Sequence, residues 1–173
     1  MHSKENYDIE NLIEEYGNDV LRIAYMYVKD AHTAEDMFQE VFIKVNKNLG
    51  KFKGKSSIKT WIIRITINTC KDYLKSAWNK RVVPIKDYQQ DNIVSDSDFK
   101  DIENQDTAEM IKEIVLELPD KYRDVILCVY YGDMSIVEAA ETLGIAEGTV
   151  KSRLYRARNR LKPLLEGRVS DEY

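Results

Sequence analysis

The sequence predicts an all-α protein made of two small helical domains joined by an acidic linker. Helix-forming residues such as Glu, Lys, Leu and Ile are frequent, whereas the 173 residues include only seven glycines and three prolines. Apolar side chains recur at helical spacing in two long stretches of the chain. A stretch without such spacing separates them. A chain of this length can bury a core as one domain or as two small ones, and the interruption favours two.

The N-terminal part, expected to form a domain over residues 1–81, begins with two helical patterns. Apolar residues recur every three or four positions over residues 9–28, which predicts the first helix. Thr33, with Asp36 three residues later, resembles a capping box and predicts that the second helix begins there. The core stripe of this second helix is Met37, Phe38, Val41, Phe42 and Val45.

A third helix is predicted over residues 58–78, after a loop that contains two glycines. On a helical wheel its apolar and small side chains fill a wide arc, so most of this helix should be packed against the other two. A narrow polar strip remains, consisting of Arg64, Asn68, Lys71 and Lys75. Trp61 and Tyr73 belong to the wide arc and are expected to be core residues.

Residues 82–107 are predicted to form the linker, because they show no period, include a proline and are rich in Asp, Ser, Asn and Gln. The second domain is expected over residues 108–168, followed by a short tail at 169–173. Helical spacing in this domain is interrupted at Pro119 and then resumes.

From Ser135 onward the chain has the order of a helix-turn-helix. Ser135 and Glu138 match a capping box, and Gly144 is expected to end a short helix, because glycine readily adopts the left-handed conformation. A longer helix follows, whose packed side is Val150, Leu154, Ala157 and Leu161. This order predicts a second helix that enters the major groove of DNA. A solvated terminal helix with surplus arginine is the alternative.

The outward side of this last helix carries hydrogen-bonding and cationic side chains. A helix in the major groove needs hydrogen-bonding groups toward the base edges and flanking cations for the phosphates. The candidate DNA-binding residues are Thr149, Lys151, Ser152, Arg153, Tyr155, Arg156 and Arg158.

Charge alternates in blocks along the chain, although the formal net charge is only -4. Residues 44–81 hold eleven Lys or Arg against a single acid, and residues 151–168 hold seven against one. Residues 1–43 and 84–107 are acidic. Two cationic segments on either side of an acidic stretch indicate two contact zones for one polyanion, with nucleic acid and a membrane surface as the candidates.

The first cationic segment begins with a lysine-rich loop, GKFKGKSSIKT, at residues 50–60. It resembles a P-loop, but only three residues separate its glycines where four are required, so nucleotide hydrolysis is not expected. Cations beside aromatic rings suit strand-separated DNA as well as duplex. The candidate residues for a single-strand site are Phe52, Lys53, Lys55, Ser56, Ser57, Lys59, Arg64, Asn68, Lys71 and Lys75. Phe52, Ser56 and Ser57 are expected to be free to reach a base.

We expect no cofactor, metal site or catalytic site. Cys70 and Cys128 fit buried reduced thiols, and zinc would need more ligands than these and the two histidines supply. Enzymatic action on nucleic acid would need a carboxylate cluster or a nucleophile with a base, and Asp72 alone among the cations of residues 44–81 supplies neither. No apolar run is long enough to cross a bilayer and no secretion signal is present, so a cytoplasmic protein is expected.

At three places the chain resembles the small, two-domain sigma factors of bacterial RNA polymerase, the extracytoplasmic-function (ECF) group of the sigma-70 family. The helix that grips the polymerase clamp in that family is similar to TAEDMFQEVFIKV at 33–45. The segment that melts and reads the minus-ten promoter element is similar to FKGKSSIKTWIIRITINTCKDYL at 52–74. Region four, which reads the minus-thirty-five element, is similar to LPDKYRDVILCVYYGDMSIVEAAETLGIAEGTVKSRLYRARNRL at 118–161.

The resemblance implies an initiation factor that binds core RNA polymerase and promoter DNA and takes no small-molecule substrate. The residues it implies for polymerase binding are Glu35, Asp36, Gln39 and Glu40. Asn68 falls where the family places an asparagine near the melted element. The resemblance further implies an anti-sigma factor, often membrane-anchored, that would hold the protein at the inner face of the membrane. The acidic linker either occupies a cationic RNA exit path or serves as a solvated tether, and both interpretations stay open.

A helix-turn-helix activator or repressor with an N-terminal sensing or dimerisation domain is the alternative function. It predicts an internal pocket or a symmetric interface within residues 1–80, and binding of a dimer to an operator without polymerase.

Overall fold

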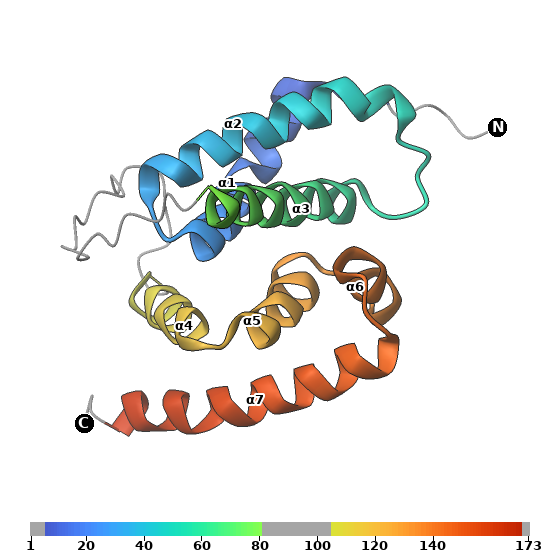
Figure 1. Ribbon diagram of the computed structural model, residues 1–173. Helices are drawn as coiled ribbons and strands as arrows, with labels where there is room; N and C mark the ends of the chain where they lie inside the picture. Colours follow the sequence, from blue (N-terminus) through green and yellow to red (C-terminus); the bar gives the residue numbers. More distant parts are fainter. Residues whose placement is uncertain (1–5, 81–104, 171–173) are drawn as a thin grey trace. The chain divides into compact units, whose positions relative to one another are not determined.

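The computed structural model describes residues 6–80 and 105–170, and the regular elements of that part of the chain are all helical (Figure 1). This confirms the all-α prediction. The chain divides into two compact units, Met1–Ile93 and Val94–Tyr173, which are described separately below. Most of the expected linker, residues 82–107, lies outside the described residues, as does the end of the expected tail.

The first unit contains α1 (Ile9–Val28), α2 (Ala31–Asn48) and α3 (Ile58–Asn79), each packed against the other two, with a short 3₁₀ turn, η1 (Leu49–Lys51), after α2. Its core consists of aliphatic side chains with almost no exposed surface, each of which contributes about 1.5–3 kcal/mol by burial. They include Val20, Ile23, Met26, Val41, Val45, Ile62, Ile63 and Ile67.

The start of α2 differs from the expectation. Its N-cap is Asp30, whose Oδ2 accepts hydrogen bonds from the Thr33 amide at 2.9 Å and the Thr33 hydroxyl at 2.6 Å. The predicted capping box at Thr33 and Asp36 is therefore wrong. An aspartate caps a helix at least as well as a threonine, so the helix begins one turn earlier.

The second unit contains α4 (Gln105–Glu117), α5 (Asp120–Ile126), a π-helical turn η2 (Leu127–Tyr131), α6 (Ile136–Leu143) and α7 (Glu147–Ser170). Pro119 is the N-cap of α5, consistent with the break expected there. Helix α7 packs against α4, α5 and α6, and the core of the unit lies among them. Its buried side chains include Ile114, Val115, Val125, Leu127, Val150, Leu154 and Ala157.

The helix-turn-helix has the local signals that the sequence predicts. The Ser135 hydroxyl accepts from the Glu138 amide at 3.1 Å, and the Glu138 carboxylate accepts from the Ser135 amide at 2.9 Å, which completes a capping box. Gly144 ends α6 in the left-handed region, with φ 66° and ψ 36°. These two signals confine α6 to eight residues and set the direction of the turn into α7.

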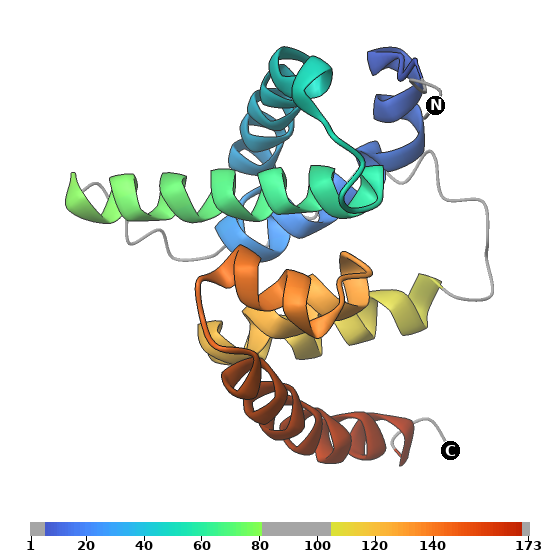
Figure 2. The same cartoon turned by 90° about the vertical axis from the view of Figure 1, so that its right-hand side faces the viewer.

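Helix α7 is longer than expected from the apolar spacing alone. It continues through Pro163 as an uninterrupted ribbon to Ser170 (Figure 2). A proline within a helix removes one backbone hydrogen bond, so this part of α7 is intrinsically weaker than the part before it.

Candidate nucleic-acid interface

The outer side of α7 presents the side chains predicted to contact DNA. Lys151, Ser152, Tyr155, Arg156 and Arg158 are exposed, whereas Thr149 and Arg153 are half-buried. Val150, Leu154 and Ala157 are buried on the opposite side, so packing fixes which side faces outward. Tyr155 is 67% exposed, which is unusual for a large aromatic residue that serves only the core.

The cations of this surface are not neutralised by acids. Within the described ranges, no carboxylate forms an ion pair with Lys151, Arg153, Arg156 or Arg158. Their charge is therefore available for phosphate groups without the loss of an existing ion pair. A polyanion is the ligand that such a surface favours.

Two tyrosines contact the arginines of α7. The Tyr130 hydroxyl accepts a hydrogen bond from Arg158 Nε at 2.7 Å, and the Arg160 guanidinium lies 5.0 Å from the centre of the Tyr122 ring. Burial raises the pKa of the Tyr122 phenol, but a hydrogen bond from Arg156 and the nearby positive charges outweigh that effect and lower the pKa below its ordinary value. The arginine side chains are thus partly oriented before any ligand binds. The sequence pattern places Tyr130 in an apolar helical stretch and predicts no role in DNA binding for either tyrosine.

The lysine-rich loop of the first unit borders an open pocket of about 220 Å³ next to the start of α3. This volume is below the roughly 300–1,000 Å³ of sites for drug-sized ligands, and it suits a group as small as one base. The residues around the pocket are Lys51, Phe52, Lys53, Lys55, Ser56, Trp61 and Arg64. Five residues of the predicted single-strand site are therefore brought together here.

Phe52 and Ser57, which the sequence leaves free to reach a base, also have roles in the fold, although Ser57 is exposed. The Phe52 ring is half-buried and packs between Tyr7 and Trp61, with ring centres 5.8 and 5.1 Å away. The Ser57 hydroxyl caps α3 by accepting from the Thr60 amide at 3.1 Å. Phe52 thus forms a wall of the pocket, and Ser57 fixes the helix that bounds it.

The polar strip of α3 runs away from this pocket. Asn68 and Lys75 are exposed, and Arg64 and Lys71 are half-buried. Lys59, at the start of α3, forms an ion pair with Asp19 of α1, with 3.9 Å between Lys59 Nζ and Asp19 Oδ2.

The two aromatic residues expected in the core of α3 differ in their burial. Trp61 is half-buried, whereas Tyr73 is 39% exposed, so the expectation of a core position fails for Tyr73. Tyr73 lies in the last two turns of α3, near the end that the other helices cover least.

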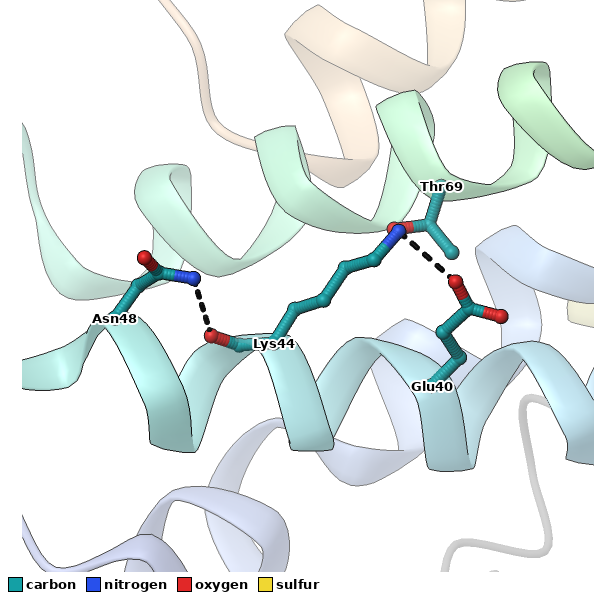
Figure 3. A network of polar contacts seen from close by, with 4 residues as sticks. All are labelled: Glu40, Lys44, Asn48 and Thr69. Atoms are coloured by element: carbon teal, nitrogen blue, oxygen red, sulfur yellow. Dashed lines mark hydrogen bonds and ion pairs between the residues drawn. The ribbon is translucent and has the colours of Figure 1, made fainter.

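The three acids and one glutamine predicted to bind polymerase share the outer side of α2. Glu35, Asp36, Gln39 and Glu40 are all exposed. Glu40 Oε1 forms an ion pair with Lys44 Nζ at 3.0 Å, and the same ammonium group donates to Thr69 Oγ1 of α3 at 3.2 Å (Figure 3). Lys44 therefore connects the acidic side of α2 to α3. A glutamate followed by a lysine four positions later is a helix-pair signal that sequence analysis could have used.

Two further findings concern chemistry that this interface does not use. Among the described residues, no group of three or more His, Cys, Asp or Glu side chains could hold a metal ion, and no helix is long and apolar enough to span a membrane.

Burial raises the pKa of the Cys70 thiol to about 12, which keeps it protonated and unreactive near neutral pH. The larger surface hollow, about 420 Å³ at the turn between α6 and α7, includes Glu141 and Glu147 and so does not suit a polyanion.

The fold and these surfaces define a two-unit helical DNA-binding protein, with a helix-turn-helix in one unit and a cationic pocket in the other. The family model for sigma-70 region 2 matches residues 12–80, and the model for sigma-70 region 4 matches residues 108–161. The chain belongs to the sigma-70 family of RNA polymerase sigma factors, in its ECF group.

Individual relatives support this assignment over nearly the whole chain. The chain is 30% identical over 164 residues to ECF RNA polymerase sigma factor SigM of Bacillus subtilis. The aligned residues make up 95% of this chain and 99% of the relative. It is 32% identical over 168 residues to ECF RNA polymerase sigma-E factor of Escherichia coli, covering 89% and 86% of the two chains. The solved structure of sigma factor RpoE in complex with the anti-sigma factor NepR from Bartonella quintana is similar, with a TM-score of 0.64 and 26% identity over 91% of this chain and 98% of that chain.

Proposed function

We propose that the protein binds core RNA polymerase, recognises the minus-thirty-five and minus-ten promoter elements, and holds the opened strands while the polymerase does the chemistry. The observation that carries this proposal is that each of the two units has its own cationic surface, one on a helix-turn-helix and one around a pocket the size of a base. In this mechanism the chain itself catalyses no reaction.

The second unit, which we take to be a functional domain over residues 108–168, reads the minus-thirty-five duplex. The start of α7 enters the major groove, where Lys151, Ser152 and Tyr155 face the base edges. Arg156 lies on the same exposed side and can bind guanine in bidentate fashion. Thr149 and Arg153, which are half-buried, contact the sugar-phosphate backbone of the DNA beside the groove.

The first unit, which we take to be a domain over residues 1–81, binds the minus-ten element after the strands part. One unstacked base enters the pocket between Phe52, Trp61 and Arg64, while Lys53 and Lys55 neutralise its phosphates. Asn68, Lys71 and Lys75 extend this contact along α3. Because the pocket accepts only a base that has left the stack, binding there stabilises the opened DNA over the closed duplex.

Polymerase binding is assigned to the exposed acidic side of α2. Glu35 and Asp36 form no ion pair with a neighbour within the described part of the chain, so they can pair with cations of the polymerase. The neutral Gln39 amide can add hydrogen bonds beside them. Glu40 is held by Lys44 and contributes from a fixed position.

An anti-sigma factor is the regulatory partner that we propose. The similar sigma factor RpoE of Bartonella quintana was solved in complex with the anti-sigma factor NepR. A partner that covered the acidic side of α2 would compete directly with core polymerase. Anchoring of such a partner in a membrane would hold this cytoplasmic protein at the inner face of that membrane.

A run-off transcription assay with purified core polymerase and a library of promoters tests the proposal. We expect transcripts only when the protein is added, from templates that share two elements at a fixed separation. A protein that shifts duplex DNA by itself and fails to bind core polymerase would instead be a stand-alone regulator, and this proposal would be wrong.

A further inference from the structure

Tyr130 and Arg158 form an exposed pair that joins η2 to α7. Arg158 Nε donates to the Tyr130 hydroxyl at 2.7 Å, and the guanidinium carbon lies 5.6 Å from the centre of the Tyr130 ring. Arg158 is exposed, and Tyr130 retains 51% of its surface. A pair that served only to fasten α7 to the core would be expected to bury its ring more completely.

The pair keeps unused hydrogen-bond donors on its open side. Arginine has five N–H donors, of which one is used here, and a tyrosine hydroxyl that accepts a hydrogen bond still has its own proton to donate. Within the described residues, no carboxylate pairs with Arg158. Two kinds of donor with one positive charge are thus presented together, an arrangement that suits the oxygens of a phosphate.

The place of Arg158 on α7 separates it from the base-reading positions. It follows Lys151 by seven residues, so both lie on one side of the helix, about 10 Å apart along its axis. In helix-turn-helix docking the first residues of the second helix reach the base edges. A side chain two turns further along the same side lies toward the sugar-phosphate backbone that borders the groove.

We propose that Tyr130 and Arg158 together form a clamp for one backbone phosphate beside the minus-thirty-five element. This inference rests on the proposed function of α7, and it gives Arg158 a positioning role in place of base reading. Tyr130 fixes the guanidinium by accepting from its Nε, and both residues then donate to the same phosphate. The clamp adds affinity that does not depend on base sequence.

The test measures binding of holoenzyme, assembled from core polymerase and the full chain, to promoter duplex and to a duplex with a scrambled upstream element, over a series of salt concentrations. Arg158→Ala should weaken binding to both duplexes by a similar factor and reduce the slope of log K against log salt by about 0.9, the value for one lost phosphate contact. Tyr130→Phe should weaken binding to both duplexes several-fold in the wild-type background. In the Arg158→Ala background it should weaken this binding much less. Tyr131→Phe, a matched loss of one hydroxyl from the same element, should leave the slope unchanged.

The outcomes separate this inference from the proposed function. Holoenzyme that distinguishes the two duplexes, but whose salt slope is unchanged in Arg158→Ala, would overturn the clamp alone. A full additional loss from Tyr130→Phe in the Arg158→Ala background would also overturn it. Wild-type holoenzyme that cannot distinguish promoter from scrambled duplex would overturn the proposed function and the clamp with it.

Discussion

The side chains of α7 are divided between the core and the outer surface, because packing fixes which side of the helix faces inward. Val150 and Ala157 have no exposed surface, and this fixes the direction in which Lys151, Ser152 and Arg156 point. The exposed arginines would repel one another in the absence of a ligand, and contacts with tyrosines partly replace the missing acids. The tyrosines thus help to orient the arginine side chains, and sequence patterns do not identify this role.

At this scale, Arg156→Ala should weaken binding to the minus-thirty-five duplex by about 1–3 kcal/mol, the usual value for one bidentate base contact. Binding to core polymerase should not change, because Arg156 is exposed on α7 and the surface assigned to polymerase is on α2. Fluorescence anisotropy with labelled duplex measures the first quantity, and a pull-down with core polymerase measures the second. Loss of polymerase binding would mean that the two surfaces have been assigned to the wrong units.

How much of the candidate site could be predicted differs from residue to residue. Exposure of Lys151, Ser152, Tyr155 and Arg156 follows from helical period alone, because an apolar stripe determines the opposite side. The packing of Phe52 against Tyr7 could not be predicted, because forty-five positions separate them and only the folded unit brings them together.

Helices were predictable where local signals and apolar period agree. The bounds of α1 coincide with its apolar stretch, and α6 is limited by Ser135 and Gly144. Two elements departed from expectation. Asp30 competes successfully with Thr33 as the cap of α2, and α7 continues beyond the last regular apolar position and through Pro163, although its side chains from 162 to 167 are mostly exposed. The ends of helices are therefore harder to predict than their existence, because a competing cap or a short extension leaves the apolar period unchanged.

The turn of the helix-turn-helix provides a prediction at the element scale. Gly144→Ala should lower the free energy of unfolding by about 1–2 kcal/mol, because φ is 66° there and a side chain disfavours that region. No atom lies within 4 Å of the added methyl group, so the loss would come from the backbone and not from a clash. Gly148→Ala is the matched control, since this glycine lies within α7 and also has open space around it. It should be neutral or stabilising by up to about 1 kcal/mol. Urea unfolding of both variants measures the difference, and equal effects would contradict the assigned turn.

The link between α2 and α3 provides a second prediction at this scale. Lys44→Met removes the ion pair with Glu40 and the hydrogen bond to Thr69, so it should reduce the free energy of unfolding. The loss should be only about 0.5–1 kcal/mol, because the lysine is half-exposed and solvent screens its ion pair. Lys47→Met is the matched control, since Lys47 is exposed on the same helix and forms no ion pair within the described residues. Urea unfolding compares the two. An equal effect of both substitutions would show that the bond to Thr69 in Figure 3 contributes nothing to stability.

At the scale of the whole molecule, the proposed function separates recognition of paired strands from binding of single strands. Each unit has its own core, so each can present its surface without help from the other. In the proposed function the helix-turn-helix binds duplex DNA before and after opening, whereas the pocket gains its ligand only on opening. This division means that damage to one surface should affect one step of initiation more than the other.

Asn68→Ala tests that division. Asn68 is exposed in the middle of the polar strip of α3, and its amide group can donate to and accept from the Watson–Crick edge of a base only after that base has unpaired. We expect the variant holoenzyme to form the closed complex with nearly unchanged affinity, measured by gel shift at low temperature. Strand opening, measured by permanganate reactivity of thymines in the minus-ten element, should fall by about tenfold or more, which corresponds to the loss of about 1.4 kcal/mol of stabilisation in the open state alone. Lys75→Ala, a change of an exposed cation about two turns further along α3, is the companion variant, and it should also reduce opening more than closed-complex formation, but by a factor that depends on salt. If Asn68→Ala damaged closed-complex formation and opening equally, α3 would contact the duplex before melting, and the assignment of its pocket to single-stranded DNA would be wrong.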